Sequence, residues 1–278
     1  MLENFIYENH LGQRFVGLEN GVYINSNDLR NYQWSYDTIN GRISRFYRQT
    51  TNRKLPLTVI CKTGDEAVSA KNRLLDIAEA DIEAMAPGKI IIGDYYTKGY
   101  ITESAKSDYM INRRYCKINL TFTSENDNSM WYREETRAFI PGSGAREVIG
   151  DGKDYPYEYQ YDYAAPQEVN RIVCNSIRAS DFRLKIYGQV TNPAVTINRH
   201  TYAINGTVNQ GETLLIDSIA KTITLTTAMG TKINWFDHRN RENYIFQPIP
   251  AGINNITRNG SFGFDLTVIE KRSEPKWT

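Results

Sequence analysis

The sequence predicts a mainly β protein that contains one long helix. Two observations carry the β prediction: Asn-Gly pairs recur along the chain, and several segments alternate apolar and polar residues with a period of two. A third observation, one stretch of helical spacing in the first half, predicts the helix. With 278 residues, the chain is long enough for one large β domain or two of ordinary size.

Turns and strands follow from local patterns. Asn-Gly pairs are expected hairpin corners because both residues of a type I′ turn need positive φ angles; they lie at 20–21, 40–41, 205–206 and 259–260, with Asp-Gly at 151–152. The clearest alternation occurs at residues 115–122, 182–187 and 262–268. Each of these segments is typical of an antiparallel strand with one buried face.

The helix is expected at residues 65–86, which contain much Ala and no Gly or Pro before Pro87-Gly88. Asp65 and Glu66 would lie in the first turn, where they favour the positive end of the helix dipole. Apolar residues at helical spacing predict that one side packs across a sheet. These residues are Ala67, Ala70, Leu74, Leu75, Ile77, Ala78, Ile82 and Met85.

Residues 42–48 alternate apolar side chains with basic or polar ones and predict a strand. Through residues 50–54 they lead to a second expected strand at 55–62, so the two strands are expected to form a hairpin. The pattern fits an ordinary hairpin with solvated basic residues. It also fits a projecting arm that lies across a neighbouring subunit, where its arginines meet carboxylates.

The glycine-rich residues 141–154 predict a linker. We therefore expect a first domain at residues 1–142, which holds the helix, and a second domain at 143–278 built from strands and turns. At residues 155–163, five tyrosines alternate with Pro, Glu, Gln and Asp. In a strand their rings would share one face, either covering the core of the second domain or forming a contact surface for sugar or protein.

Composition excludes several classes of protein. The 33 Lys and Arg against 32 Asp and Glu leave a formal charge of +1, which argues against a dominant nucleic-acid or anionic-membrane surface. The first residues show no basic region followed by an apolar run, so no signal peptide is expected. No stretch approaches the ~18 apolar residues of a membrane span. We expect a soluble protein made in a cytoplasm.

Residues able to carry chemistry are scattered. The three cysteines, Cys61, Cys116 and Cys174, are too far apart for a disulfide framework or a CxxC metal pair. None of the histidines, His10, His200 and His238, has a partner at a metal-ligand spacing. The sequence therefore predicts no catalytic residue, no metal site and no cofactor site.

A polysaccharide hydrolase remains a minority interpretation. Its paired carboxylates could come from the aromatic-rich second half, which holds Asp162, Asp181, Glu212 and Asp217. A chain with 32 acidic residues always contains such a pair, so the pattern is weak evidence for catalysis.

Several segments, in their order along the chain, resemble the distal tail protein family of siphophages. In the first half these are residues 27–36, the Leu-Pro-Leu at 55–57, the helix end at 86–89 and Gly-Tyr-Ile at 99–101. In the second half they are residues 211–218, 221–223, 249–254 and 275–277. The resemblance spans most of the chain.

The resemblance implies a structural, non-enzymatic hub of a phage tail tip or baseplate. Members of the family form a hexameric ring whose lumen continues the tail tube, and a hairpin arm belts the adjacent subunit. The second domain is then expected to be a galectin-like β-sandwich. Expected partners are further copies of the chain in a homohexamer, the tail tube protein, a tail-tip or tail-associated protein and a receptor-binding protein. DNA would pass through the lumen without specific binding, and the expected location is the virion tail after synthesis in the bacterial cytoplasm.

Two expectations follow for sites. A ring of identical subunits needs a head-to-tail interface, and an arm that crosses to the neighbour would set its rotation. Arg42, Arg45, Tyr47 and Arg48 are therefore expected in or near the subunit interface. The alternative function is a carbohydrate-binding module that attaches to bacterial surface glycan, which predicts an exposed aromatic patch.

Overall fold

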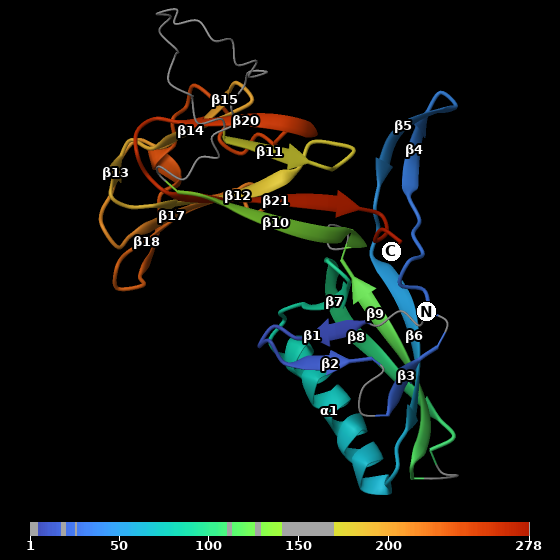
Figure 1. Cartoon of the computed structure of the whole chain (residues 1–278). Coiled ribbons are helices and arrows are strands. Elements are labelled where there is room, and N and C mark those ends of the chain that lie inside the picture. The colour runs from blue at the N-terminus through green and yellow to red at the C-terminus, as the bar shows by residue number, and fades with distance from the viewer. Residues whose placement is uncertain are drawn as a thin grey trace, which may run out of the picture. The chain divides into compact units, whose positions relative to one another are not determined.

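The structure is a computed structural model that describes residues 5–17, 21–25, 27–109, 113–125, 129–140 and 170–277. These residues form mainly antiparallel strands, with one α-helix and one short 3-10 helix among them (Figure 1). The mainly β class predicted from the sequence is confirmed. The described residues divide into two compact units: one extends to Arg133 and takes up the chain again at Lys271, and the other runs from Glu134 to Glu270.

The change from one unit to the other falls inside two strands. Strand β10 (Trp131–Phe139) begins in the first unit and ends in the second, and β21 (Phe264–Arg272) runs from the second back to the first. The domain boundary expected at 142/143 stays a prediction. It lies outside the described residues, as do the expected linker at 141–154 and the tyrosine-rich residues 155–163.

The first unit is built from antiparallel strands in the order β2-β1-β7-β8-β9-β6-β3. Their bounds are β1 (Ile6–Glu8), β2 (Arg14–Val16), β3 (Val22–Ile24), β6 (Thr51–Ile60), β7 (Gly88–Ile92), β8 (Tyr95–Ser107) and β9 (Tyr115–Ser124). Strand β9 confirms the alternation predicted for residues 115–122, because Cys116, Ile118, Leu120 and Phe122 are all buried. These side chains pack into the core of the first unit.

Helix α1 (Gly64–Glu83) confirms the predicted helix, and it packs against β2, β6 and β8. The Thr63 hydroxyl accepts a bond from the Glu66 backbone, and the Glu66 carboxylate accepts one from the Thr63 backbone, which together form a capping box. The buried stripe comprises Ala67, Ala70, Leu74, Ile77, Ala78 and Asp81. The expected burial of Ile82 and Met85 is wrong, because Met85 turns to a φ of 50° and both side chains are exposed.

The predicted hairpin exists, but its strands differ from those expected. Strand β5 (Arg42–Tyr47) pairs with β4 (Ser35–Ile39), not with the strand at 55–62. Asn40 and Gly41 join β4 and β5 with φ angles of 50° and 74°, so the turn predicted at 40–41 is confirmed. Strand β6 pairs instead with β3 and β9. The alternate apolar residues of β6 are buried in the core, whereas no residue of β5 is buried.

Two of the other expected hairpin corners are wrong. The pair at 205–206 joins β15 (His200–Ala203) to β16 (Thr207–Val208), which belong to different sheets, and the pair at 259–260 lies between β20 (Gly252–Arg258) and β21, again in different sheets. An Asn-Gly pair permits a tight turn, but burial of the flanking strands selects their partners. The pairs at 20–21 and 151–152 fall partly or wholly outside the described residues.

The second unit contains two larger sheets and one short pair of strands. The first has the order β19-β18-β17-β12-β21-β10, the second has the order β11-β20-β14-β15, and β13 pairs with β16. Further bounds are β11 (Asn170–Cys174), β12 (Asp181–Tyr187), β13 (Val190–Thr191), β14 (Ala194–Ile197), β17 (Thr213–Asp217), β18 (Thr222–Thr226) and β19 (Lys232–Asn234). A 3-10 turn, η2 (Phe236–His238), is an exception to the expectation of strands and turns alone.

Both sheets of the second unit contribute side chains to one hydrophobic core, as in a β-sandwich. Leu184 and Ile216 come from the first sheet, and Val195 and Ile256 from the second. The strands predicted at 182–187 and 262–268 are confirmed, although the second begins at Phe264. Their buried residues are Phe182, Leu184, Ile186, Phe262, Phe264, Leu266 and Val268.

Candidate functional site: an exposed hairpin

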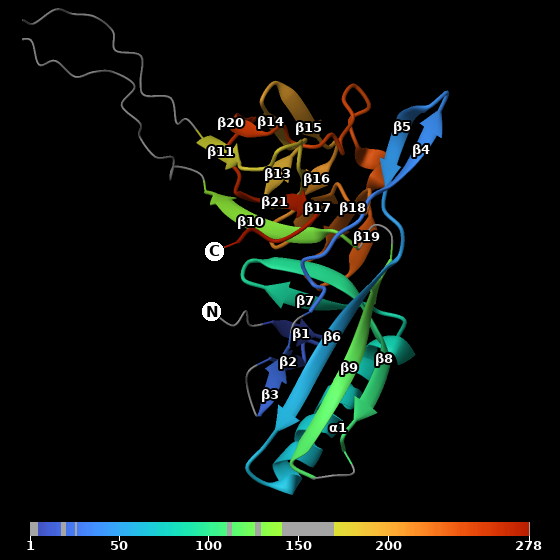
Figure 2. The ribbon, with the colours of Figure 1, turned by 90° about the vertical axis from the view of Figure 1, so that its right-hand side faces the viewer.

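The β4–β5 hairpin, residues 35–47, extends away from the strands of the first unit (Figure 1 and Figure 2). We call it the arm. Every residue from Tyr36 to Phe46 is exposed. An isolated two-stranded ribbon gains little stability in water, so an arm of this kind is suited to contact with another molecule.

One face of the arm is apolar. Tyr36 and Phe46 are opposite each other in the register, and their ring centroids lie 6.3 Å apart in an edge-to-face arrangement. Ile43 follows on the same face, opposite Thr38. The exposed fractions of Tyr36, Phe46 and Ile43 are 57%, 59% and 53%. Such a run of exposed apolar side chains marks a contact surface.

The other face of the arm is mostly charged. Asp37 pairs with Arg45, and Ile39 pairs with Arg42, on either side of a β-bulge. The Arg45 guanidinium carbon lies 5.8 Å from the centre of the Tyr47 ring. Neither Arg42 nor Arg45 forms an ion pair with any carboxylate in the described part of the chain. Both cations are therefore available to an acidic partner.

Arg48 differs from the other three residues predicted for the interface. Arg42, Arg45 and Tyr47 lie on the arm, whereas Arg48 lies at its base and is only 8% exposed. Its guanidinium carbon is 4.5 Å from the centre of the Trp34 ring and 5.6 Å from that of Tyr32. Burial lowers the pKa of Arg48. Arg48 therefore contacts its own subunit in this structure.

A second buried arginine, Arg53, was missed by sequence reasoning. It is 1% exposed, and its guanidinium donates to the Ser129 carbonyl at 2.8 Å and the Ser124 hydroxyl at 3.3 Å. Burial, with Arg48 as a nearby like charge, lowers the pKa of Arg53 to about 10. The signal was present in β6, because Arg53 falls in the same alternating phase as the buried Leu55 and Leu57.

A buried polar cluster joins α1 to β1. Asp81 is fully buried and accepts hydrogen bonds from the Tyr7 hydroxyl at 2.5 Å and the His10 backbone at 2.8 Å. The His10 Nδ1 lies 2.6 Å from the Asp81 carboxylate. A Cβ added to Gly88 would lie 2.3 Å from the Asp81 carboxylate, so no space is left for a ligand there. His10 was expected to be isolated, and the sequence prediction did not include Asp81, although this residue falls at helical spacing from the buried Ile77 and Ala78.

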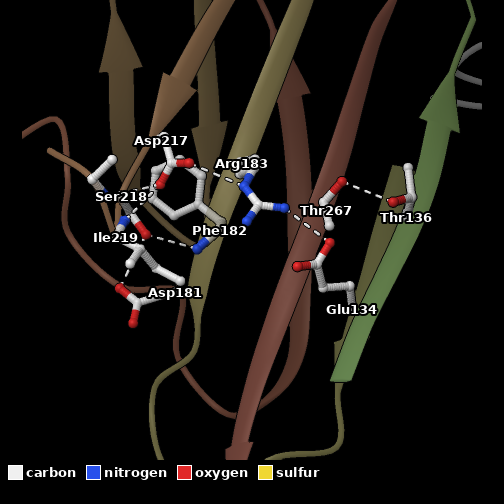
Figure 3. A network of polar contacts seen from close by, with 10 residues as sticks. Glu134, Thr136, Asp181, Phe182, Arg183, Asp217, Ser218, Ile219 and Thr267 are labelled. Atoms are coloured by element: carbon white, nitrogen blue, oxygen red, sulfur yellow. Dashed lines mark hydrogen bonds and ion pairs between the residues drawn. The ribbon is translucent and has the colours of Figure 1, made fainter. Parts of the chain in front are cut away.

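Three of the four candidate carboxylates of the hydrolase interpretation make contacts within the second unit, and Figure 3 shows those of Asp181 and Asp217. Asp217 accepts from Arg183 at 3.0 Å, and Arg183 also pairs with Glu134 at 2.9 Å. Asp181 accepts from the Ser218 hydroxyl at 3.0 Å, and Glu212 accepts from the Asn209 backbone at 2.8 Å. Asp162 lies outside the described residues. These contacts join Asp181, Glu212 and Asp217 to neighbouring strands and turns of the second unit.

A surface hollow of about 450 Å³ lies beside η2 in the second unit. Its lining includes Phe236, Arg239, Asn240, Arg241, Asn243 and Tyr244. The Arg239 guanidinium carbon lies 4.0 Å from the centre of the Phe236 ring, and Tyr244 is 56% exposed. Exposed rings beside amide and guanidinium groups can contact a sugar.

Two kinds of feature are absent from the described residues. Among them, no three His, Cys, Asp or Glu side chains gather so as to hold a metal ion. No helix in the described part of the chain has the length and apolar character needed to cross a membrane.

The fold of this chain is similar to that of phage hub and baseplate chains in solved structures. The crystal structure of SPP1 Dit (gp 19.1), described as a paradigm of the hub adsorption apparatus in phages that infect Gram-positive bacteria, matches with a TM-score of 0.59 at 11% identity. The match covers 98% of this chain and 100% of that chain.

Two structures of the phage P2 baseplate in its activated conformation match equally well. The calcium form has a TM-score of 0.62 at 13% identity, and the strontium form has 0.61 at 14%. Each match covers 98% of this chain and 99% of the other. No protein-family model and no curated protein sequence matches the chain. The resemblance predicted from the sequence is confirmed at the level of the fold.

Proposed function

We propose that this chain is a structural hub protein of a phage tail tip or baseplate. The observation that carries the proposal is the match of its whole fold to SPP1 Dit and to the P2 baseplate chains, which covers 98% of its length. In this role the protein joins the tail tube to the host-adhesion apparatus within the virion. The role is assembly, with no enzymatic activity and no cofactor.

The arm is the proposed interface between copies. Its apolar face, formed by Tyr36, Ile43 and Phe46, needs a covering surface, and Arg42 and Arg45 need carboxylates near it. An arm on one copy that lies across the next makes a head-to-tail contact, which closes into a ring at a defined rotation. We propose six copies in that ring, with the tail tube continued by its lumen.

The second unit is the proposed docking side for the remaining partners. In this proposal the second unit is a galectin-like sandwich on the outside of the ring, where a receptor-binding protein docks. The tail tube protein and a tail-associated protein contact the ring along its axis. Near-neutral net charge, a formal +1, suits a surface covered by further copies and by tail proteins.

The test is the solution mass of the purified chain by light scattering across a concentration series, with negative-stain imaging of the same peak. We expect a six-fold ring with a central hole at high concentration, dissociating on dilution. A variant in which a Gly-Gly turn replaces residues 36–46 should stay folded and remain a monomer. A chain that is monomeric at every concentration and binds bacterial glycan would overturn the proposal.

A second candidate function rests on the hollow beside η2. Its exposed Tyr244 ring, with amide and guanidinium groups around it, favours weak binding of bacterial surface glycan. Titration with cell-wall polysaccharide should give a saturable signal that Tyr244→Ala abolishes. Tyr109→Ala, which removes a comparably exposed ring in the first unit, is the matched control. Equal binding by both variants would exclude this hollow as a glycan site.

A further inference from the structure

The base of the arm is in contact with the C-terminal residues 273–277, which we call the strap. The arm is attached by two legs, residues 28–34 before β4 and residues 48–50 after β5. Arg30 on the first leg places its guanidinium carbon 3.8 Å from the centre of the Trp277 ring, and it donates to the Pro275 carbonyl at 2.8 Å. At the other end of this leg, the Trp34 indole donates to the Ser273 hydroxyl at 3.3 Å. The strap therefore contacts the first leg near both of its ends.

Arg48 connects the second leg to the first. Arg48 packs on the rings of Trp34 and Tyr32, and its guanidinium donates to the Gln33 carbonyl at 3.3 Å. Trp34 thus contacts both the strap and Arg48. The Nε and Nη2 atoms of Arg48 have no hydrogen-bond partner, and no carboxylate of the described residues pairs with it. Its buried charge is stabilised by the ring faces, which must stay in place to do so.

The start of the first leg is anchored to the core. Leu29 is 1% exposed, and the Asp28 backbone donates to the Lys54 carbonyl of β6. From Tyr32 to Trp34, the polar and ring contacts that the described residues provide are those to Ser273 and Arg48. A leg held mainly through such peripheral contacts can pivot when they are lost.

We propose that the strap sets the orientation of the arm, with Trp277 and Arg30 as positioning residues. The strap follows β21, which begins in the second unit, so it also connects a strand of that unit to the base of the arm. An arm that pivots meets the next copy less often in the correct geometry, so loss of the strap contact should weaken assembly. This consequence rests on the proposed function, in which the arm is the interface between copies.

The direct test is hydrogen exchange with mass spectrometry on the full chain carrying Trp277→Ala. Peptides that cover residues 28–34 and 46–50 should exchange about tenfold faster, which corresponds to ~1.4 kcal/mol, while peptides from β9 and β12 keep their rates. Trp277→Phe retains a ring over Arg30 and should restore most of the protection. Tyr109→Ala, the loss of another exposed ring, should leave the legs unchanged.

A second variant distinguishes loss of the strap contact from a folding defect. Arg30→Gln keeps most of the side-chain length, removes the charge over Trp277 and should reproduce the faster exchange of the legs. The proposal is overturned when both Trp277→Ala and Arg30→Gln are folded and the legs exchange as in the wild type.

Light scattering separates this proposal from the proposed function. If the wild type assembles, Trp277→Ala should need about tenfold more protein to assemble, the same ~1.4 kcal/mol. Assembly by Trp277→Ala at the wild-type concentration would refute a positioning role, even with faster exchange of the legs. If the wild type stays monomeric at every concentration, the exchange of the legs still decides whether the strap holds the arm.

Discussion

At the scale of single residues, buried polar groups are held by specific partners. Asp81 is satisfied by Tyr7 and His10, whereas Arg48 relies on ring faces and Arg53 on a carbonyl and a hydroxyl. Burying a charged group without such partners costs several kcal/mol, so these positions tolerate little change. The periodicity of α1 and β6 shows that Asp81 and Arg53 lie on buried faces, but it does not identify their partners.

Gly88→Ala should destabilise the first unit by about 2–3 kcal/mol. The added Cβ would lie 2.3 Å from the Asp81 carboxylate and 2.6 Å from the Tyr7 hydroxyl, both fully buried. Urea unfolding followed by circular dichroism measures the change. Gly64→Ala, at the start of α1 and 3.3 Å from the Arg113 side chain, is the control and should be neutral or slightly stabilising. Equal stability of Gly88→Ala and the wild type would contradict the close packing.

Thiol reactivity should distinguish the three cysteines. Burial raises the pKa of the Cys174 thiol to about 11, and Cys116 is also buried, whereas Cys61 is partly exposed. A thiol reagent at pH 8 should therefore label Cys61 first and the other two only after unfolding. The folded state holds the Cys174 proton more tightly than the unfolded state, so the free energy of unfolding should fall as pH rises from about 9 towards 11. Cys174→Ala should reduce that fall.

At the scale of elements, α1 and the arm differ in how far the local sequence predicts them. Helix α1 could be predicted because its acidic first turn, its apolar spacing and the Pro87-Gly88 stop signal all lie within or close to its own residues. The turn of the arm could be predicted for the same reason, from Asn40-Gly41. The partner of β5 could not, because residues 42–47 contain no buried apolar face that would fix a register in the core.

Thr63→Ala should destabilise the first unit by about 1 kcal/mol, because it leaves the Glu66 backbone N–H at the start of α1 without its acceptor. Thr63→Ser keeps the hydroxyl and should retain nearly the full stability. Thermal unfolding of the two variants beside the wild type measures the difference. A Ser variant as unstable as the Ala variant would assign the loss to packing of the Thr63 methyl group instead of the cap.

At the scale of the whole molecule, the proposed function depends on the side chains that the folded units leave exposed. Each unit has a hydrophobic core of its own buried side chains, and the arm exposes apolar and basic groups to solvent. A fold shared with phage hub proteins at 11–14% identity shows how little of the sequence is needed to specify it. The fold does not determine the chemistry of the surface, so the proposed assembly role must be tested on the surface of the arm.

The double variant Ile43→Ser, Phe46→Ser should abolish self-association while leaving stability within about 0.5 kcal/mol of the wild type. Both side chains are more than half exposed, so they contribute little to the isolated subunit. Sedimentation or light scattering over a concentration series measures assembly, and urea unfolding measures stability. Ile177→Ser, Met229→Ser, on exposed residues of the second unit, is the control. Equal self-association by the two double variants would show that the arm is not part of the interface.

The sequence by itself determined the mainly β class, helix α1, the alternating strands at 115–122 and 182–187 and the turn at 40–41, because these depend on residues close along the chain. The tertiary structure alone decided the partners of β5 and β6, the pairing of His10 with Asp81 and the contact of Trp277 with Arg30. Residues 30 and 277 meet only because strands far apart in the sequence share one folded unit. Local periodicity shows which faces are buried, and only the folded core decides which of those faces meet.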